Sequence, residues 1–318
     1  MALASQHMRA ASGATGGRVA FYCMSSDIYF LGAVAMINSL RLLGHDEPVY
    51  VLDLGMRPGQ RALIEPHVTV VELEDETPPW LSKTVAPLAH PAETMVLIDA
   101  DMVVTRPLDD LIAEAAGGRV IAVEHGSDRH VPEWGELLDL GPVRRQTYVC
   151  SGLVITGRSP GEEILGLMAD RRDRVEFDRT SVAGYDTDYP LLFLDQDLLN
   201  AILASRVEAE RVVVLERRLE AIPPFEGLRV VDEDSLRCEY EDGTEPYAIH
   251  HFSVKPWLEP TPHGVYTQLL RRLLTRDDVA IRVPESELPL HLRTGLIARA
   301  RHTGTRVGSR IRSAVRSR

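Results

Sequence analysis

The sequence predicts an α/β protein built on a mainly parallel β-sheet that carries helices on both faces. Short apolar runs rich in β-branched residues recur through the first half of the chain, and stretches with helical spacing separate them. Continuous apolar strands of this kind are typical of parallel sheets whose two faces are both covered. The 318 residues, of which 44% are hydrophobic, suffice for one large domain and exclude disorder as the main state.

The expected strands are short apolar runs. They span residues 18–23, 48–54, 68–73, 95–98, 119–123 and 148–155, and a further strand-like run covers 247–252. Helices are expected at 31–43, where Gly44 provides a stop, at 57–65, and from about residue 195. In sheets of this kind, ligands bind beyond the carboxyl ends of the strands.

Composition shifts divide the chain into four expected segments. These are a flexible leader at 1–17, a main domain at 18–260, a C-terminal helical extension at 261–292 and a basic tail at 293–318. No apolar run reaches the roughly 18 residues of a membrane-spanning helix, and the leader lacks the apolar core of a secretory signal. Three widely spaced cysteines predict a reduced cytoplasm and argue against a thiolate zinc site.

Charge is distributed unevenly along the chain. The net charge is −12, although residues 293–318 hold eight arginines and no acidic residue. The acidic body excludes a nucleic-acid-binding enzyme. Written at helical spacing, the tail predicts a basic amphipathic segment that contacts an anionic membrane surface. The alternative is a disordered tail that folds back on the acidic body.

Asp99 and Asp101 follow the expected strand 95–98 and are separated by the small residue Ala100. Since side chains two apart on a strand point the same way, the two carboxylates are expected to converge at the ligand-binding edge. Such a pair can hold a hard divalent cation, which in turn holds a diphosphate. The residues alone leave open the alternative that a strand-end aspartate caps a turn.

Two further polar groups stand at expected element boundaries. Asp195, Gln196 and Asp197 open a helix-like run; N-terminal capping explains one aspartate but not a neutral glutamine between two acids. The loop that starts at Ser25, with Asp27 and Tyr29, can seat a nucleobase or can cap the following helix, and both readings remain open.

His250 and His251 lie near the end of the expected strand 247–252, close to Lys255 and Trp257. Neighbouring residues on a strand face opposite sides, so at most one of the two histidines is expected to bind a cation. Lys255 could then face a phosphate. Alternatively, the turn is simple packing in which Trp257 is buried and Lys255 keeps its head in water.

The order of these motifs resembles glycosyltransferase family 8, the retaining nucleotide-sugar transferases that include glycogenin and bacterial galactosyl- and glucosyltransferases. The likeness covers residues 18–257 in the family's order, and both lysines of the chain fall where the family's pattern has a basic residue. The residues that carry it are Asp27 to Ala33, Lys83, Leu97 to Asp101, Ser151-Gly152, Asp195 to Asn200, His251 and Lys255 to Trp257.

The resemblance implies a single Rossmann-like GT-A domain and assigns roles residue by residue. Asp99, Asp101 and His251 (or His250) would bind Mn²⁺ or Mg²⁺, with Ala100 between the carboxylates. Tyr29 and the loop from Ser25 through Asp27 would cradle uridine. Lys83, Lys255, Trp257, Ser151 and Gly152 would lie around the donor's phosphates and sugar. Asp195 would bind sugar hydroxyls, and Gln196 would lie beneath the anomeric carbon.

The chain departs from the family's pattern in two places. Cys150 stands where the family usually has an asparagine before the small-Gly pair. The family places its histidine six residues before the lysine, whereas His251 is four and His250 five residues before Lys255. We expect His251 to be the ligand because it precedes Phe252, as in the family's His-Phe pair.

The expected activity is metal-dependent transfer of a hexose-type sugar from UDP to an acceptor hydroxyl, with retention and front-face attack, because Gln196 is a poor nucleophile. The sugar and the acceptor are not readable from the sequence. One rival is a phosphatase of the haloacid dehalogenase type with Asp99 as nucleophile and Asp101 as acid/base. The other is a binding module for nucleotide sugars that has no catalytic activity.

Overall fold

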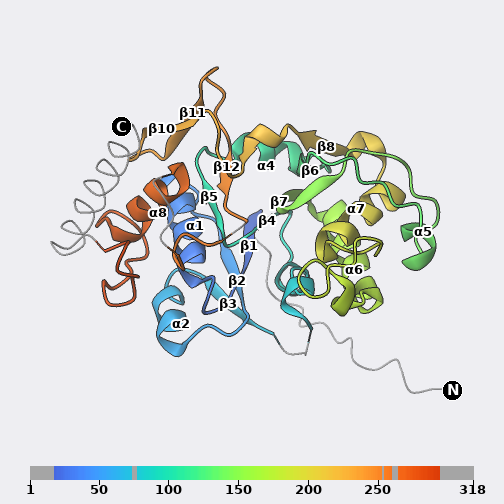
Figure 1. Ribbon diagram of the computed structural model, residues 1–318, viewed down its shortest axis with the longest axis horizontal. Helices are drawn as coiled ribbons and strands as arrows, with labels where there is room; N and C mark the ends of the chain where they lie inside the picture. Colours follow the sequence, from blue (N-terminus) through green and yellow to red (C-terminus); the bar gives the residue numbers. More distant parts are fainter. Residues whose placement is uncertain (1–17, 74–76, 253, 260–263, 294–318) are drawn as a thin grey trace, which may run out of the picture.

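The computed structural model describes residues 18–73, 77–252, 254–259 and 264–293, and its centre is a seven-stranded sheet (Figure 1). The strand order is β3-β2-β1-β4-β7-β6-β8. The expected leader and nearly all of the expected basic tail lie outside the described residues. None of the described helices combines the length and the apolar character that crossing a bilayer requires.

The large sheet is mainly parallel, as the sequence predicts. Its strands are β1 (Val19–Ser25), β2 (Val49–Asp53), β3 (Thr69–Glu72), β4 (Thr94–Ile98), β6 (Val120–Glu124), β7 (Val149–Gly157) and β8 (Val212–Leu215). Only β7 runs against its two neighbours, β4 and β6. The amino end of β7 therefore lies beside the carboxyl end of β4, where Ile98 is paired with Leu153 and the Asp99 amide donates to the Gly152 carbonyl at 2.9 Å.

A second sheet of three short strands lies next to this edge. It contains β5 (Met102–Val104), β12 (Ala248–His250) and β9 (Glu220–Ala221), in the order β5-β12-β9. A separate hairpin is formed by β10 (Leu228–Asp232) and β11 (Arg237–Tyr240). β5 was not expected from the sequence, because the apolar residues 102–104 follow β4 after only a three-residue turn. β12 is also shorter than the expected 247–252, so His251 and Phe252 lie beyond its end.

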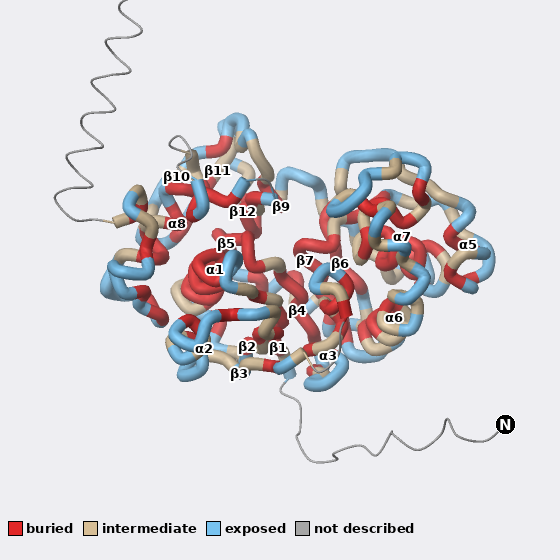
Figure 2. The backbone as a smooth tube through the Cα atoms, turned by 60° about the horizontal axis from the view of Figure 1, so that its bottom comes forward, coloured by how far each residue is buried: buried red, intermediate tan, exposed pale blue. Residues whose placement is uncertain are grey.

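The helices cover both faces of the large sheet (Figure 1). α1 packs against α8 and β5, whereas α6 packs against α7 in a second hydrophobic cluster. Figure 2 shows the central strands β4 and β7 as buried. The helices are α1 (Phe30–Leu42), α2 (Pro58–Ile64), α3 (Val85–Ala89), α4 (Asp109–Ala116), α5 (Trp134–Leu137), α6 (Arg158–Arg171), α7 (Leu194–Arg206) and α8 (Val265–Thr275).

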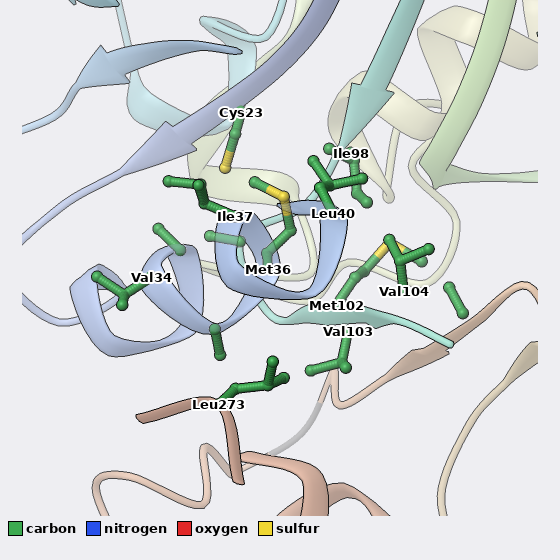
Figure 3. Close-up of a cluster of buried hydrophobic side chains, with 14 of the residues drawn as sticks. Cys23, Val34, Met36, Ile37, Leu40, Ile98, Met102, Val103, Val104 and Leu273 are labelled. Carbon is green, nitrogen blue, oxygen red and sulfur yellow. The ribbon is translucent and has the colours of Figure 1, made fainter. Parts of the chain in front are cut away.

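Helix α1 is buried on nearly all sides between the large sheet and α8. Figure 3 shows Ile37 and Leu40 pointing toward Cys23 of β1 and Ile98 of β4, with Leu273 of α8 on the opposite side of the helix. The helix ends one residue earlier than expected, and Gly44 follows with φ of +87°, a left-handed conformation that glycine adopts at little cost. This burial fixes the amino end of α1 against the turn that carries Asp99 and Asp101.

The segment expected as a C-terminal extension packs on α1 through a buried asparagine. The amide nitrogen of Asn38 donates to the carbonyls of Leu273 and Ile281, both at 2.9 Å, and its oxygen accepts from the Ile281 amide at 2.8 Å. Asn38 is fully buried. One side chain thereby pairs three main-chain groups that water cannot reach. The division at residue 260 itself stays a prediction.

Asn38→Ala is expected to lower the free energy of unfolding by about 2–4 kcal/mol, because three buried main-chain groups lose their partner. Chemical denaturation of the purified protein measures this change. Ser286→Ala, an exposed change in the same C-terminal segment, is the control and should alter stability little. A loss below about 0.5 kcal/mol for Asn38→Ala would contradict the assigned role.

Candidate active site

Asp99 and Asp101 lie in the turn between β4 and β5, at the carboxyl edge of the large sheet. One oxygen from each carboxylate and one ring nitrogen of His250 lie within 4.8 Å of one another. The convergence of the two aspartates is as the sequence predicts, but a turn produces it and not strand alternation. We call Asp99, Asp101 and His250 the acidic-histidine cluster.

The amino end of α1 approaches this turn closely because Gly32 has no side chain. A Cβ at this position would lie 2.4 Å from the Ala100 carbonyl oxygen and 2.5 Å from the ring of Trp257. Trp257 is buried, and its indole nitrogen donates to the Ile28 carbonyl at 2.7 Å. The residue between the two aspartates is therefore held against α1 and Trp257.

Lys83 joins three elements of the site. Its ammonium lies 2.9 Å from an Asp99 oxygen and 3.0 Å from an Asp195 oxygen, and it donates to the Ser151 carbonyl at 2.9 Å. The side chain is only 11% exposed. Lys83 was expected at the donor's phosphates or sugar, and in the structure it is paired with two carboxylates of the site.

The sequence left His251 and His250 open as cation ligands with a preference for His251, and it is His250 that lies with Asp99 and Asp101 in the acidic-histidine cluster. The Nε2 atom of His250 lies 3.1 Å from an Asp101 oxygen, and its Nδ1 atom lies 2.8 Å from Glu220. The ring of His251 packs edge-on against Tyr266, 5.2 Å away between centroids. His251 lies one residue beyond the end of β12, and its ring is not part of the cluster.

Lys255 and Tyr29 lie on the α1 side of Asp101. The Lys255 ammonium forms an ion pair with Asp101 and donates to the His251 carbonyl at 2.8 Å. It also lies 5.4 Å from the centre of the Tyr29 ring, which meets Trp257 edge-on. The residues of the expected Lys-Pro-Trp turn thus contact both the acidic-histidine cluster and the expected uridine loop.

The loop after β1 does not cap α1 through a side chain. The Asp27 carboxylate accepts hydrogen bonds from Arg57 and Gln60 of the α2 region, both at 2.8 Å, and the α1 cap at Tyr29 has no side-chain hydrogen bond. Ser25 is buried, while Tyr29 keeps 36% of its surface exposed. The capping alternative is therefore excluded, and an exposed ring remains available to a ligand.

At the amino end of α7, the Gln196 amide is committed to hydrogen bonds. Its oxygen accepts from the Ser151 amide at 3.3 Å, and its nitrogen donates to the Tyr148 hydroxyl at 3.1 Å. One turn on, Asn200 pairs with both main-chain groups of Val149 at 2.8 Å. These contacts fasten α7 to the start of β7 and place Asp195 and Gln196 beside the acidic-histidine cluster.

Asp197, the third residue of this motif, has a structural role. It is fully buried and binds Arg129 through both oxygens, at 2.8 and 3.0 Å. It also accepts from the Tyr148 hydroxyl and the Phe193 amide, both at 2.7 Å. Every oxygen is satisfied inside the protein, so Asp197 supports the site without facing it.

Burial and neighbouring charges set the protonation of the acidic-histidine cluster. Burial raises the pKa of Asp99, against the opposing effect of Lys83. Burial alone would also raise the pKa of Asp101, yet His250 and Lys255 hold it well below its usual range. Burial would lower the pKa of His250, but Asp101 and Glu220 raise it to about 10.

A pocket of about 370 Å³ opens beside the cluster, within the size range of small-molecule sites. Its polar lining includes Asp99, Ser151, Gly152, Asp195, Gln196, Glu220 and His250. Trp80, His125, Cys150, Val182, Phe193, Arg217 and Phe252 line it as well. The pocket lining does not include the expected uridine residues Ser25, Asp27 and Tyr29, nor Lys255 and Trp257.

Sequence reasoning missed Glu220 and Arg129. Glu220 lies on a two-residue strand without any motif, and its partner His250 is 30 residues away. Arg129 meets Asp197 across 68 residues. Neither contact leaves a local pattern, because both depend on how distant strands pair. The Asp197 motif itself was the only available signal for a buried partner of opposite charge.

The sequence matches no protein-family model and no curated protein. Among solved structures, an active-site mutant of LgtC has a TM-score of 0.52 at 14% identity, covering 84% of this chain and 98% of that chain. The galactosyltransferase LgtC with donor and acceptor sugar analogues has a TM-score of 0.51 at 17% identity, with 81% and 98% covered.

The apo structure of WbbM, a bifunctional glycosyltransferase, is also similar, with a TM-score of 0.52 at 14% identity. The likeness covers 83% of this chain and 50% of that one. At such low identity these comparisons establish the fold alone. The chain has an α/β fold similar to that of GT-A glycosyltransferases, as the sequence predicts.

Asp197→Ala is expected to destabilise the protein by about 3–5 kcal/mol, because it leaves the Arg129 guanidinium partly buried without its counter-charge. Thermal and chemical unfolding without any ligand provide the measurement. Asp242→Ala is the matched control. It removes another bidentate Asp–Arg ion pair, with Arg218, which is solvent-exposed. Equal unfolding curves for the two variants would refute the structural role of Asp197.

Proposed function

We propose that this chain is a divalent-metal-dependent glycosyltransferase that moves a hexose-type sugar from a UDP-sugar to an acceptor hydroxyl and retains the anomeric configuration. The observation that carries the proposal is the acidic-histidine cluster at the edge of a pocket that Asp195 and Gln196 also line. The similarity in fold to glycosyltransferases supports the same activity.

The donor set of the cluster fits a divalent cation. Two carboxylates and one imidazole nitrogen come within 4.8 Å of one another, and such mixed oxygen and nitrogen ligation suits Mn²⁺ better than Mg²⁺. A bound cation would neutralise charge on the diphosphate of the donor. Asp99, Asp101 and His250 are the residues that would hold it, and His251 is not among them.

The donor nucleotide is proposed to lie on the α1 side of Asp101. The loop from Ser25 to Tyr29 offers an exposed aromatic ring for the uracil base. Lys255 lies next to that ring and to Asp101, so its ammonium is placed to move from Asp101 to a phosphate. A positive charge already present at the donor site would stabilise the leaving diphosphate.

The donor sugar is proposed to bind over Asp195, Ser151 and Gly152, with its anomeric carbon near Gln196. The amide of Gln196 carries no charge, and Ser151 and Tyr148 occupy it, so it is not a nucleophile. We infer front-face attack. The acceptor oxygen bonds to the anomeric carbon as the bond to the diphosphate breaks, and the departing phosphate takes the hydroxyl proton.

The acceptor is proposed to enter through the outer part of the pocket. Trp80 and Phe252 line it and expose 44% and 55% of their surfaces, and Trp80 is braced by stacking on Phe177 at 5.3 Å. Exposed rings can pack against the face of a sugar or another ring. Cys150 also lines this wall, where the family's asparagine would otherwise supply an amide.

The cytoplasm remains the compartment that we propose, since the three cysteines are all unpaired in the structure. Peripheral contact with an anionic membrane remains a proposal as well. It rests on the composition of residues 293–318, of which all but Arg293 lie outside the described residues.

Asp101→Asn is expected to reduce turnover at least 100-fold while the protein stays folded, because the amide keeps the shape of the carboxylate but loses its charge. Initial rates with Mn²⁺ and melting curves without metal provide the measurement. Asp53→Asn, at the carboxyl end of β2 in the same sheet and outside the cluster, is the control. Turnover of Asp101→Asn at the wild-type rate would exclude Asp101 as a metal ligand.

A thermal-shift panel of nucleotide sugars, with and without Mn²⁺, tests the function as a whole. UDP-sugars are expected to raise the melting temperature in the presence of Mn²⁺, since a ligand that binds only the native state stabilises it.

The product should be α-linked from an α-linked donor, read from its NMR coupling constant. A β-linked product would overturn retention.

The two rival functions have their own readouts. Phosphate release from p-nitrophenyl phosphate would favour the phosphatase. Binding of UDP-sugar without slow hydrolysis would favour the binding module.

A further inference from the structure

Glu220 is a buried carboxylate that contacts His250 of the acidic-histidine cluster. It is 1% exposed, and one oxygen lies 2.8 Å from Nδ1 of His250. We propose that Glu220 is a positioning residue that fixes the ring orientation and the tautomer of His250, so that Nε2 faces the divalent cation. This inference rests on the proposed function, because it presupposes a metal at Asp99, Asp101 and His250.

Three neighbouring strands bring Asp101, His250 and Glu220 together. Asp101 immediately precedes β5, His250 ends β12 and Glu220 begins β9, and these strands form one sheet in the order β5-β12-β9. In the register of this sheet, His250 is paired with Met102, and Ala248 with Glu220. The backbone pairing therefore sets the order Asp101, His250, Glu220 across the sheet.

The two ring nitrogens of His250 have separate partners. Nε2 lies 3.1 Å from Asp101, whereas Nδ1 lies 2.8 Å from Glu220. When Nδ1 carries the proton that Glu220 accepts, the lone pair of a neutral ring resides on Nε2, on the side of the cluster. A carboxylate behind a ligating histidine orients the ring and raises its basicity.

The burial of Glu220 is compensated by His250. Among the described residues its only ion pair is with His250, and its second oxygen has no hydrogen-bond partner. A buried carboxylate is unfavourable unless its charge is compensated. His250 alone therefore supports it in the structure, which makes the contact specific to this pair.

Gly152 provides the space that the pair requires. A Cβ at this position would lie 3.0 Å from Cε1 and 3.2 Å from Nδ1 of His250, and 3.4 Å from the Glu220 oxygen. The amino end of β7 thus passes directly beneath the hydrogen bond. The small residue that the family pattern places here is needed in this chain for the His250–Glu220 pair as well as for any ligand.

The test compares Mn²⁺ binding by the full-length wild-type protein, Glu220→Gln and Glu47→Gln, measured as free Mn²⁺ by electron paramagnetic resonance. Glu220→Gln keeps the volume of the side chain but loses its charge, and its amide can donate to Nδ1 and favour the wrong tautomer. The expected result is a 10- to 100-fold weaker Mn²⁺ affinity. Glu47 lies 3.5 Å from His45, which makes it a matched Glu–His pair outside the cluster, and its variant should bind as the wild type does.

A spectroscopic readout separates positioning from a merely structural role. Long-range ¹⁵N–¹H spectra of the Cd²⁺-loaded protein should show the His250 ring protonated at Nδ1 in the wild type, and this pattern should be lost in Glu220→Gln. His250→Asn identifies the signal. Gly152→Ala leaves Glu220 in place but presses on the ring, so it should also weaken Mn²⁺ binding, and it replaces Glu220→Gln if that variant does not fold.

Each outcome decides between the proposals. If the wild type binds Mn²⁺ and both Glu220→Gln and Gly152→Ala bind it equally well, the positioning role of Glu220 is wrong while the metal site stands. If the wild type protein itself binds no Mn²⁺, the metal-dependent function and this inference fall together. Weaker binding with an unchanged ¹⁵N pattern would also overturn the positioning role.

Discussion

The candidate active site depends on one buried ammonium. Lys83 lies 2.9 Å from Asp99 and 3.0 Å from Asp195, and it donates to the Ser151 carbonyl. Without this charge the two carboxylates would repel each other in a poorly hydrated place, and at least one would be driven to take up a proton. The same ammonium links the end of β4, the start of β7 and the start of α7. Lys83 therefore compensates the charge of the two carboxylates and also holds these three elements together.

Asp101 has its own set of compensating charges, from the other side of the turn. His250 and Lys255 both contact it and keep it ionised, while Glu220 supports His250 from behind. Lys83 and Lys255, the only lysines of the chain, are thus divided between the two aspartates of the motif. Tyr29 and Lys255 lie near Asp101 but do not line the pocket. Asp195 and Gln196 line the pocket. This division supports the separate placement of nucleotide and acceptor in the proposed reaction.

Much of the fold could be predicted from local patterns. The strands of the large sheet that were expected all form, with ends shifted by one or two residues, because apolar runs with β-branched side chains specify buried strands by themselves. Strand β5 was missed because it is three residues long and follows β4 directly. The preference for His251 rested on the family's His-Phe pair, whereas β12 ends at His250, and His250 is the histidine that lies beside Asp99 and Asp101.

The sequence by itself determined which chemical groups are present and where elements end: Asp99 and Asp101 after an apolar strand, and Asp195 and Gln196 at a helix start. Only the tertiary structure decided how those groups are paired. The antiparallel insertion of β7 beside β4, and the pairing of β12 with β5 and β9, are contacts between residues tens to more than a hundred positions apart. Such contacts leave no period in the sequence, because their energy comes from burial and charge compensation that arise only when distant segments meet.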